Sequence, residues 1–376
     1  MKDPLYLDYN ATAPLRPEAL RAYTDAAGQA GNASSVHSFG RASRKIVEEA
    51  RRRIAVSIDA DPAQVIFLSG GTEANATALG SVIDERKPER LLVSDVEHTS
   101  VLQAFPDFTQ TLPVDSQGRV TADVVAEALD ETNAATRVSV MLANNETGVI
   151  QPIQEIAEAV HARGGLLHCD AVQGLGKRPL SFSELGADIL SLSAHKLGGP
   201  QGVGALVLRN GLHMEAYLRG GGQEGRRRAG TENVAGIAAF GAAVEAAVSR
   251  LEEFETLHKA HHSMEQEILK AAPTATVFGA ETERLPNTSC IAMPGVSAEL
   301  QLMSLDLEGI AVSAGSACSS GKVEPSHVLR AMGAGDSLSA NAIRVSSGWA
   351  SKPEDLERFA DAWIRLYQRQ HQSSVA

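Results

Sequence analysis

The chain has 376 residues, 43% of them hydrophobic, and a formal net charge of −12 at pH 7. This length predicts one large domain with a smaller one beside it, and the acidic balance argues against binding to nucleic acid or to anionic membranes. No apolar run reaches the roughly 20 residues that span a bilayer, and the first residues lack the apolar core of a signal peptide. Three scattered cysteines are too few for a disulfide framework or a zinc knuckle, so we expect a cytoplasmic protein without a bound metal.

Short apolar runs alternate with helical stretches through the first part of the chain. The runs predict strands at 65–68, 91–94, 138–142, 166–170, 187–193 and 204–208. Helices are predicted from 74 to about 84, from a Thr121 cap to 129, and from Pro152 to Gly164-Gly165. Strands that alternate with helices indicate an α/β domain with a largely parallel sheet.

The remaining third of the chain has a different pattern. Residues 232–271 are rich in alanine and glutamate and predict one long connecting helix. Beyond Pro273, short strands are predicted at 288–293 and 309–313, with a last helix from 353 to about 367. This part of the chain is therefore predicted to form the second, smaller domain.

Polar residues follow several of the predicted strands. In a parallel sheet the ligand crevice lies beyond the carboxyl ends of the strands. Five residues of different chemistry fall there: Thr72, His98, Asn145, Asp170 and Lys196. Their convergence predicts a ligand site at this edge of the sheet.

Three of these positions point to one cofactor. Lys196 ends a strand in Ser193-Ala194-His195-Lys196, and a crowded lysine loses its proton and becomes an amine able to form a Schiff base. Asp170 could keep a ring nitrogen protonated, and Gly71-Thr72 opens a helix whose free N–H groups would bind one phosphate. Pyridoxal phosphate requires all three groups. Taken singly, a solvated lysine, a helix cap and an ordinary glycine turn are the alternative interpretations.

The three cysteines differ in their surroundings. Cys318 lies among serine, alanine and glycine in 313–321, which predicts an exposed loop on which a reactive thiol could visit a cofactor and then a partner. A solvent-exposed bystander is the alternative. Cys169 and Cys290 lie in apolar runs and are predicted to be core residues.

Two further residues could act at such a site. Arg344 lies in the strand-like run 342–346, where an inward guanidinium would meet an anion such as a substrate carboxylate, unless the position is a solvated edge. His98 could stack flat on a ring or move protons, although a lone histidine is more often a surface or core residue.

Blocks along nearly the whole chain, from Leu5 to Trp349, resemble the cysteine desulfurases of the NifS/IscS type, which are class V, fold-type I pyridoxal phosphate enzymes. The blocks are 6–12, 31–32, 70–73, 97–98, 144–148, 170–173, 193–196, 228–231 and 316–320. The resemblance implies a fold-type I transferase in which helices surround a mostly parallel seven-stranded sheet in residues 15–255. A smaller α+β domain would combine 1–14 with 256–376 and carry the catalytic cysteine loop. It also implies a homodimer with the active site at the subunit interface.

The resemblance implies a role for each matching residue. Lys196 would hold pyridoxal phosphate as a Schiff base, Asp170 would pair with the ring nitrogen, Gln173 with the ring hydroxyl, and His98 would stack on the ring. The phosphate would be bound by Gly71, Thr72, Ser193 and His195, with Thr231 from the neighbouring subunit. Asn145 would contact the cofactor and, with Arg344, hold the substrate carboxylate. Cys318 would attack the substrate sulfur, with His98 as the hypothetical acceptor of its proton.

The activity implied is removal of sulfur from L-cysteine, which gives L-alanine and a persulfide on Cys318. The sulfur would pass to an acceptor protein for iron–sulfur cluster, thiolated tRNA or molybdenum-cofactor synthesis. Some family members dock a scaffold protein through a longer tail than the one ending here at Ala376, so the acceptor stays open. The alternatives are a selenocysteine lyase, another class V aminotransferase or lyase that uses no thiol, and a non-catalytic sulfur-relay or binding protein.

Overall fold

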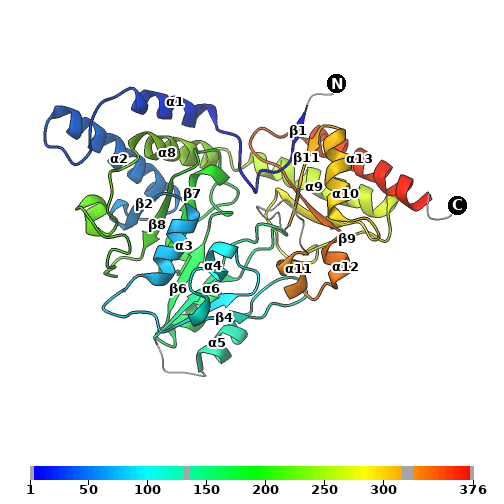
Figure 1. Cartoon of the computed structure of the whole chain (residues 1–376), viewed down its shortest axis with the longest axis horizontal. Helices are drawn as coiled ribbons and strands as arrows, with labels where there is room; N and C mark the ends of the chain where they lie inside the picture. The colour runs from blue at the N-terminus through cyan, green and yellow to red at the C-terminus, as the bar shows by residue number, and fades with distance from the viewer. Residues whose placement is uncertain (1–3, 131–134, 316–324, 373–376) are drawn as a thin grey trace.

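The computed structural model describes residues 4–130, 135–315 and 325–372, the side chains of the last two excepted. They form two lobes that meet along one side (Figure 1). Each lobe has its own hydrophobic core, one around the central sheet and one around the last helix. Cys318 lies outside the described residues.

The large lobe is built on a seven-stranded sheet, as predicted. Its strands are, in spatial order, β2 (Val65–Leu68), β8 (Gly204–Leu208), β7 (Ile189–Ser193), β6 (Leu166–Asp170), β5 (Thr136–Ser139), β3 (Arg90–Ser94) and β4 (Thr109–Leu112). All are parallel except β8, which is antiparallel to both of its neighbours. The prediction of a largely parallel sheet is confirmed.

Helices cover both faces of this sheet, because alternate residues of a strand point to opposite faces. On β2, Val65 and Phe67 belong to the core under α2 and α8, whereas Ile66 and Leu68 pack with α3. The helices of the lobe are α1 (Pro17–Ala27), α2 (Ser38–Ser57), α3 (Gly71–Gly80), α4 (Thr99–Leu102), α5 (Ala122–Asp130), α6 (Ile153–His161), α7 (Phe182–Leu185) and α8 (Val234–Val248). Short 3₁₀ helices occur at Pro62–Gln64, Pro106–Phe108, Ala194–Lys196 and Gln223–Arg226.

The small lobe holds the α+β part of the chain. Its strands are β1 (Leu5–Tyr6) beside β11 (Ile310–Ala311), and the sheet of β12 (Ser313–Ala314), β13 (Ala342–Ser346), β10 (Thr288–Ala292) and β9 (Thr276–Val277). Its helices are α9 (Glu253–Ala271), α10 (Ala298–Leu307), α11 (His327–Ala331), α12 (Asp336–Ser339) and α13 (Pro353–Gln372). The first strand of the chain therefore lies in the same lobe as its last helix (Figure 1). The domain bounds 15–255 and 256–376 stay a prediction.

The prediction of one helix over 232–271 is wrong. The chain bends by 69° between α8 and α9. The reason is that the two halves have different cores: Phe240 and Val244 of α8 are buried in the large lobe, whereas Met264 and Ile268 of α9 are buried in the small lobe. A straight helix would leave one of these apolar faces without a core.

Several other helices and strands begin or end a few residues away from their predicted bounds. The helix predicted from residue 74 begins at Gly71 and ends at Gly80, so Gly71 and Thr72 form its first turn. The strand predicted at 138–142 ends at Ser139, and the one at 309–313 is divided into β11 and β12. Among the described residues, no single helix is long and apolar enough to cross a membrane.

Candidate active site

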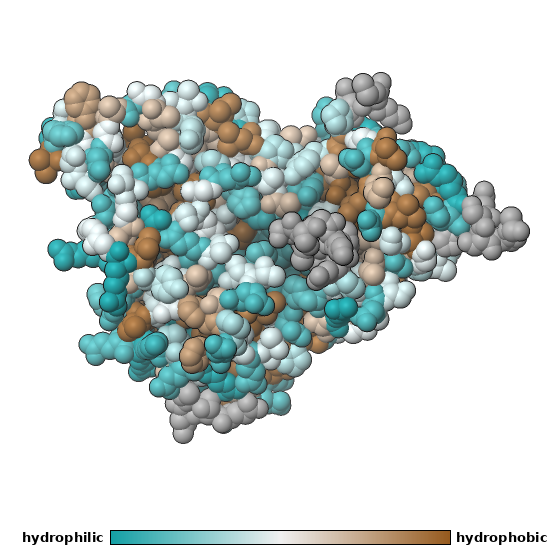
Figure 2. Space-filling view, viewed as in Figure 1, coloured by the Kyte–Doolittle hydropathy of each residue, from teal (hydrophilic) through white to brown (hydrophobic). Residues whose placement is uncertain are grey.

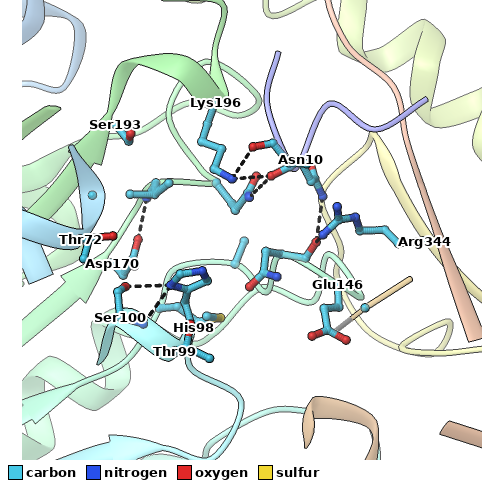
Figure 3. Close-up of a pocket in the computed structure, with 18 of the residues that line it drawn as sticks. Asn10, Thr72, His98, Thr99, Ser100, Glu146, Asp170, Ser193, Lys196 and Arg344 are labelled. Carbon is cyan, nitrogen blue, oxygen red and sulfur yellow. Dashed lines mark hydrogen bonds between the residues drawn. The ribbon is translucent and has the colours of Figure 1, made fainter. Parts of the chain in front are cut away.

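A cavity of about 650 Å³ lies beyond the carboxyl ends of the parallel strands, between the two lobes (Figure 3). Ten of the predicted site residues line it: Gly71, Thr72, His98, Asn145, Asp170, Gln173, Ser193, His195, Lys196 and Arg344. Thr231 is exposed and is not among the lining residues, and Cys318 lies outside the described residues. The strand-end rule predicted five of these ten residues, Thr72, His98, Asn145, Asp170 and Lys196, and the structure places all five in this cavity. The individual roles of the ten residues stay predictions.

Lys196 follows β7 directly, in the short 3₁₀ helix that ends the strand. Its Nζ donates to the backbone oxygens of Asn10, at 2.6 Å, and Ala11, at 2.9 Å (Figure 3). Burial lowers the pKa of Lys196 to about 8, and the Arg344 guanidinium acts in the same direction. A larger share of this amine is therefore neutral near pH 7 than of an exposed lysine, and a neutral amine is the nucleophilic form.

Asp170 ends β6, the parallel neighbour of β7, so its carboxylate and Lys196 start from adjacent strand ends. Its Oδ2 accepts a hydrogen bond from Asn75 Nδ2 at 2.7 Å, and its Oδ1 accepts one from the backbone N–H of Val172 at 2.9 Å. Only 7% of Asp170 is exposed. The carboxylate is thus fixed in one orientation at the wall of the cavity.

The N-terminus of α3 forms a donor-rich end of the cavity. The first N–H groups of a helix have no partner inside the helix, and here they belong to Gly71 and the residues after it. Ser193 Oγ, from the facing strand end, is buried and has no hydrogen-bond partner. Burial, with Lys196 and Lys177 nearby, lowers the pKa of His195 to about 4, so its ring is neutral near pH 7. These free donors suit an anion of the size of one phosphate.

His98 caps the N-terminus of α4 with its ring. Its Nδ1 accepts the backbone N–H of Ser100 at 3.1 Å and lies 2.8 Å from Ser100 Oγ. Burial lowers the pKa of His98, an effect that Asp170 opposes. The proton of the neutral ring is therefore on Nε2. His98 can accept a proton from a thiol only if Nδ1 first loses its hydrogen bonds to Ser100. Its predicted stacking and proton-transfer roles remain untested.

Arg344 points from β13 toward the cavity but is already partnered. Its Nη2 forms an ion pair with Asp8 at 2.6 Å, and its Nη1 donates to the backbone oxygen of Asn145 at 3.1 Å. Its Nε is buried and has no partner. A substrate carboxylate would therefore have to share this guanidinium with Asp8.

Sequence reasoning missed several residues of the site. Asn75 lies one helical turn after Gly71, on the same face of α3, and the helix predicted from residue 74 concealed this spacing. Asn10 and Glu146 belong to blocks 6–12 and 144–148 but had no role assigned; both line the cavity. Cys169 and Cys290 are fully buried, as predicted, and burial raises the pKa of both thiols.

Glu146 lies with its carboxylate close to the chain on both sides of the 316–324 segment. Its carboxylate accepts Ser326 Oγ at 2.6 Å, and a Cβ on Gly315 would lie only 2.0 Å from its Oε2. Burial raises the pKa of Glu146. Glycine at position 315 therefore permits a close approach that a larger residue would prevent.

Gly315→Ala should therefore destabilise the protein by about 1–3 kcal/mol, because the new methyl group forces the carboxylate or the strand to move. Urea unfolding of the purified protein measures this. Gly222→Ala is the matched control, since that glycine has φ −88° and nothing within 4 Å of its added Cβ. Equal stability of the two variants would contradict the close approach.

Comparisons with known proteins agree with this geometry. The family model described as aminotransferase class-V matches residues 5–359. Cysteine desulfurase IscS of Dictyoglomus turgidum is 41% identical over 98% of this chain and 96% of its own, and a cysteine desulfurase of Cereibacter sphaeroides is 42% identical over 93% and 92%. The structure of a NifS-like protein from Rickettsia africae covers 97% of this chain and 99% of its own with a TM-score of 0.88 and 31% identity. A structure described as SspA in complex with cysteine covers 91% and 98%, with a TM-score of 0.78 and 25% identity.

The chain therefore belongs to the class V aminotransferase family, whose members use pyridoxal phosphate. Within that family, identities of 41 and 42% over nearly the full length assign it to the cysteine desulfurases of the NifS/IscS type. The cavity fits the cofactor on its own evidence: the unpartnered Ser193 Oγ lies with the free end of α3, and an oriented carboxylate at Asp170 shares the cavity with the Lys196 amine.

The pKa of Lys196 predicts how the apoenzyme takes up pyridoxal phosphate. Lys196 would hold the cofactor through its amine, which is nucleophilic only in the neutral form, so the uptake rate should rise with pH and level off above about 8. Stopped-flow absorbance between pH 6 and 10 measures the profile. The reaction of the cofactor with free N-acetyllysine is the control and should continue to accelerate to higher pH. A profile for the apoenzyme that still rises at pH 10 would contradict the lowered pKa.

Proposed function

We propose that this protein removes sulfur from L-cysteine, releases L-alanine and keeps the sulfur as a persulfide on Cys318. The observation that carries the proposal is one cavity that combines a Lys196 amine of lowered pKa, the Asp170 carboxylate and the unpartnered Ser193 Oγ. The near full-length similarity to cysteine desulfurases supports the choice of substrate.

The residues that would hold the cofactor form two groups, one for the phosphate and one for the ring. Ser193, Thr72 and the N–H groups of α3 would bind the phosphate, with His195 beside them. Asp170 would hold the ring nitrogen protonated, and its bond from Asn75 keeps the carboxylate in position for that task. When bound, pyridoxal phosphate supplies an electron sink for the bonds at the substrate's Cα.

Side chains of the protein would then orient the substrate and transfer protons. Arg344 and Asn145 would orient the substrate carboxylate, and the Lys196 amine would move the proton at Cα. The Cys318 thiolate would attack Sγ of the substrate: the new S–S bond forms, the Sγ–Cβ bond breaks with its electron pair on Cβ, and a proton completes the methyl group of alanine. The described residues on both sides of Cys318, Ser313–Gly315 and His327, line the cavity and so support this role.

The experiment that tests the proposal is product analysis with L-cysteine and a thiol reductant. The pyridoxal phosphate-loaded protein should release alanine and sulfide in equal amounts. Pyruvate and ammonia as the products would overturn the proposal in favour of a lyase that uses no thiol. A rate with selenocysteine far above the rate with cysteine would favour a selenocysteine lyase.

We further propose that the protein is a homodimer. Exposed apolar side chains lie just before α1, on α1 and α2, and in the segment between them: Leu15, Leu20, Tyr23, Val36, Phe39 and Val56. Figure 2 shows brown atoms in this region, at the upper left. Exposed Thr231 is available to a neighbouring subunit's phosphate site, as the resemblance implies. Light scattering after size-exclusion chromatography tests this, and a monomer at micromolar concentration would overturn it.

The sulfur acceptor is proposed to be another protein of the cytoplasm, in the synthesis of iron–sulfur clusters, thiolated tRNA or molybdenum cofactor.

A further inference from the structure

A lysine that no role yet explains lies behind the cofactor site. Lys177 follows β6, in a turn where Gly176 has φ 76°, and only 4% of it is exposed. Its Nζ donates to Gln173 Oε1 at 2.5 Å and to Asn10 Oδ1 at 2.8 Å. Among the described residues, these two amide oxygens are its hydrogen-bond partners, and no carboxylate pairs with it.

The contacts of Lys177 decide how the Gln173 amide is oriented. Gln173 Nε2 donates to the backbone oxygen of Asn10 at 3.0 Å, and a carbonyl oxygen can only accept. Turning the amide over would place two acceptors against each other at Asn10 and take the oxygen away from Lys177. An amide nitrogen has two N–H groups, so one remains for the cavity that Gln173 lines.

Asn10 is held by the same amine. Its Oδ1 faces Lys177, so its Nδ2 is directed to Asn145 O at 3.1 Å and to Thr288 Oγ1 at 2.9 Å. The backbone oxygen of Asn10 also accepts Lys196 Nζ. The buried amine thus orders two amides that border the Lys196 side chain.

We propose that Lys177 is a positioning residue of the cofactor site: it fixes the Gln173 amide so that an N–H group, and not the oxygen, faces the ring oxygen of bound pyridoxal phosphate. This inference rests on the proposed function of the cavity, and it deepens it. Gln173 would touch the cofactor, whereas Lys177 acts only through Gln173 and Asn10.

The electrostatic surroundings of Lys177 agree with a structural donor. Burial lowers the pKa of Lys177 well below its ordinary value, and Lys196 and Arg344 act in the same direction. A protonated amine has three N–H groups and a neutral amine has two, so either form can donate to both amide oxygens that Lys177 contacts.

The test is a pH titration of the visible absorption band of the holoenzyme. A hydrogen bond donated to the ring oxygen stabilises the anionic form of that oxygen. It therefore lowers the pKa of the bound cofactor. Lys177→Met removes the donor to Gln173 Oε1 and to Asn10 Oδ1, so the Gln173 amide is held only through its bond to Asn10 O and can shift away from the ring oxygen. The pH midpoint of the band should then rise by about one unit, the size expected for one hydrogen bond to a charged group. Lys259→Met, at an exposed lysine of α9, is the control and should leave the midpoint unchanged.

A double-mutant cycle separates positioning from a direct effect. Gln173→Ala should raise the midpoint by itself, and Lys177→Met added to it should raise it no further. An unchanged midpoint in Lys177→Met, or shifts that add in the double variant, would overturn the inference. If Lys177→Met does not fold, as judged by circular dichroism, Lys177→Leu, which also lacks a hydrogen-bond donor, is used in the same cycle and judged by the same criteria. A wild-type protein with no visible band would instead overturn the cofactor site.

Discussion

Replacing Lys196 with alanine should slow sulfide release from L-cysteine by at least about 10³-fold. The variant lacks the amine that, on the proposed function, would attach the cofactor and move the proton at Cα, and general acid–base catalysis alone contributes about 10²–10⁴-fold. The lost hydrogen bonds go to two backbone oxygens on the 10–11 segment, so the fold should persist.

Two measurements test the prediction for Lys196→Ala. Sulfide release gives the rate, and borohydride reduction followed by mass analysis shows whether the cofactor is attached to the chain. Lys259→Ala, which removes an exposed lysine of α9, is the matched control and should behave as wild type. Sulfide release at the wild-type rate from Lys196→Ala would exclude Lys196 as the catalytic lysine.

Replacing Cys318 with serine should abolish sulfide release while the visible spectrum of the bound cofactor stays unchanged. A hydroxyl is a far weaker nucleophile than a thiolate at neutral pH, and it cannot store sulfur as a persulfide. Alkylation with a mass-tagged reagent after one turnover should locate the extra sulfur atom on Cys318 in the wild-type protein.

The other cysteines supply the control for that experiment. Cys290 is buried and its thiol pKa is raised, so Cys290→Ala should lower stability but keep sulfide release per folded molecule. Wild-type sulfide release from Cys318→Ser would leave a thiol-independent lyase as the better description of the enzyme.

Much of the large lobe could be predicted because its strands are short apolar runs with polar or glycine-rich ends. The strands at 65–68, 166–170 and 204–208 match β2, β6 and β8 at both ends. The break between α8 and α9 could not be predicted from local pattern, because it depends on which core each half reaches.

The candidate site also contains both residues that could be predicted from the sequence and residues that could not. Lys196 and Asp170 could be predicted because each ends a strand of a parallel sheet, and such ends meet at one edge. Asn10 and Lys177 could not, because their importance comes from contacts across 167 positions of the chain, which no local pattern contains. Asn75 could not be predicted either, because its role depends on a hydrogen bond to Asp170, 95 positions along the chain.

The path of the first twelve residues has a consequence for how the two lobes can move. The chain pairs with β11 in the small lobe, bridges from Asp8 to Ser346, and then places Asn10 and Ala11 against Lys196 of the large lobe. A hinge opening that moved the small lobe away would therefore strain the two hydrogen bonds between Lys196 Nζ and the 10–11 backbone. A conformational change between the lobes would thus be expected to alter the hydrogen bonding of the Lys196 amine through this short stretch of backbone.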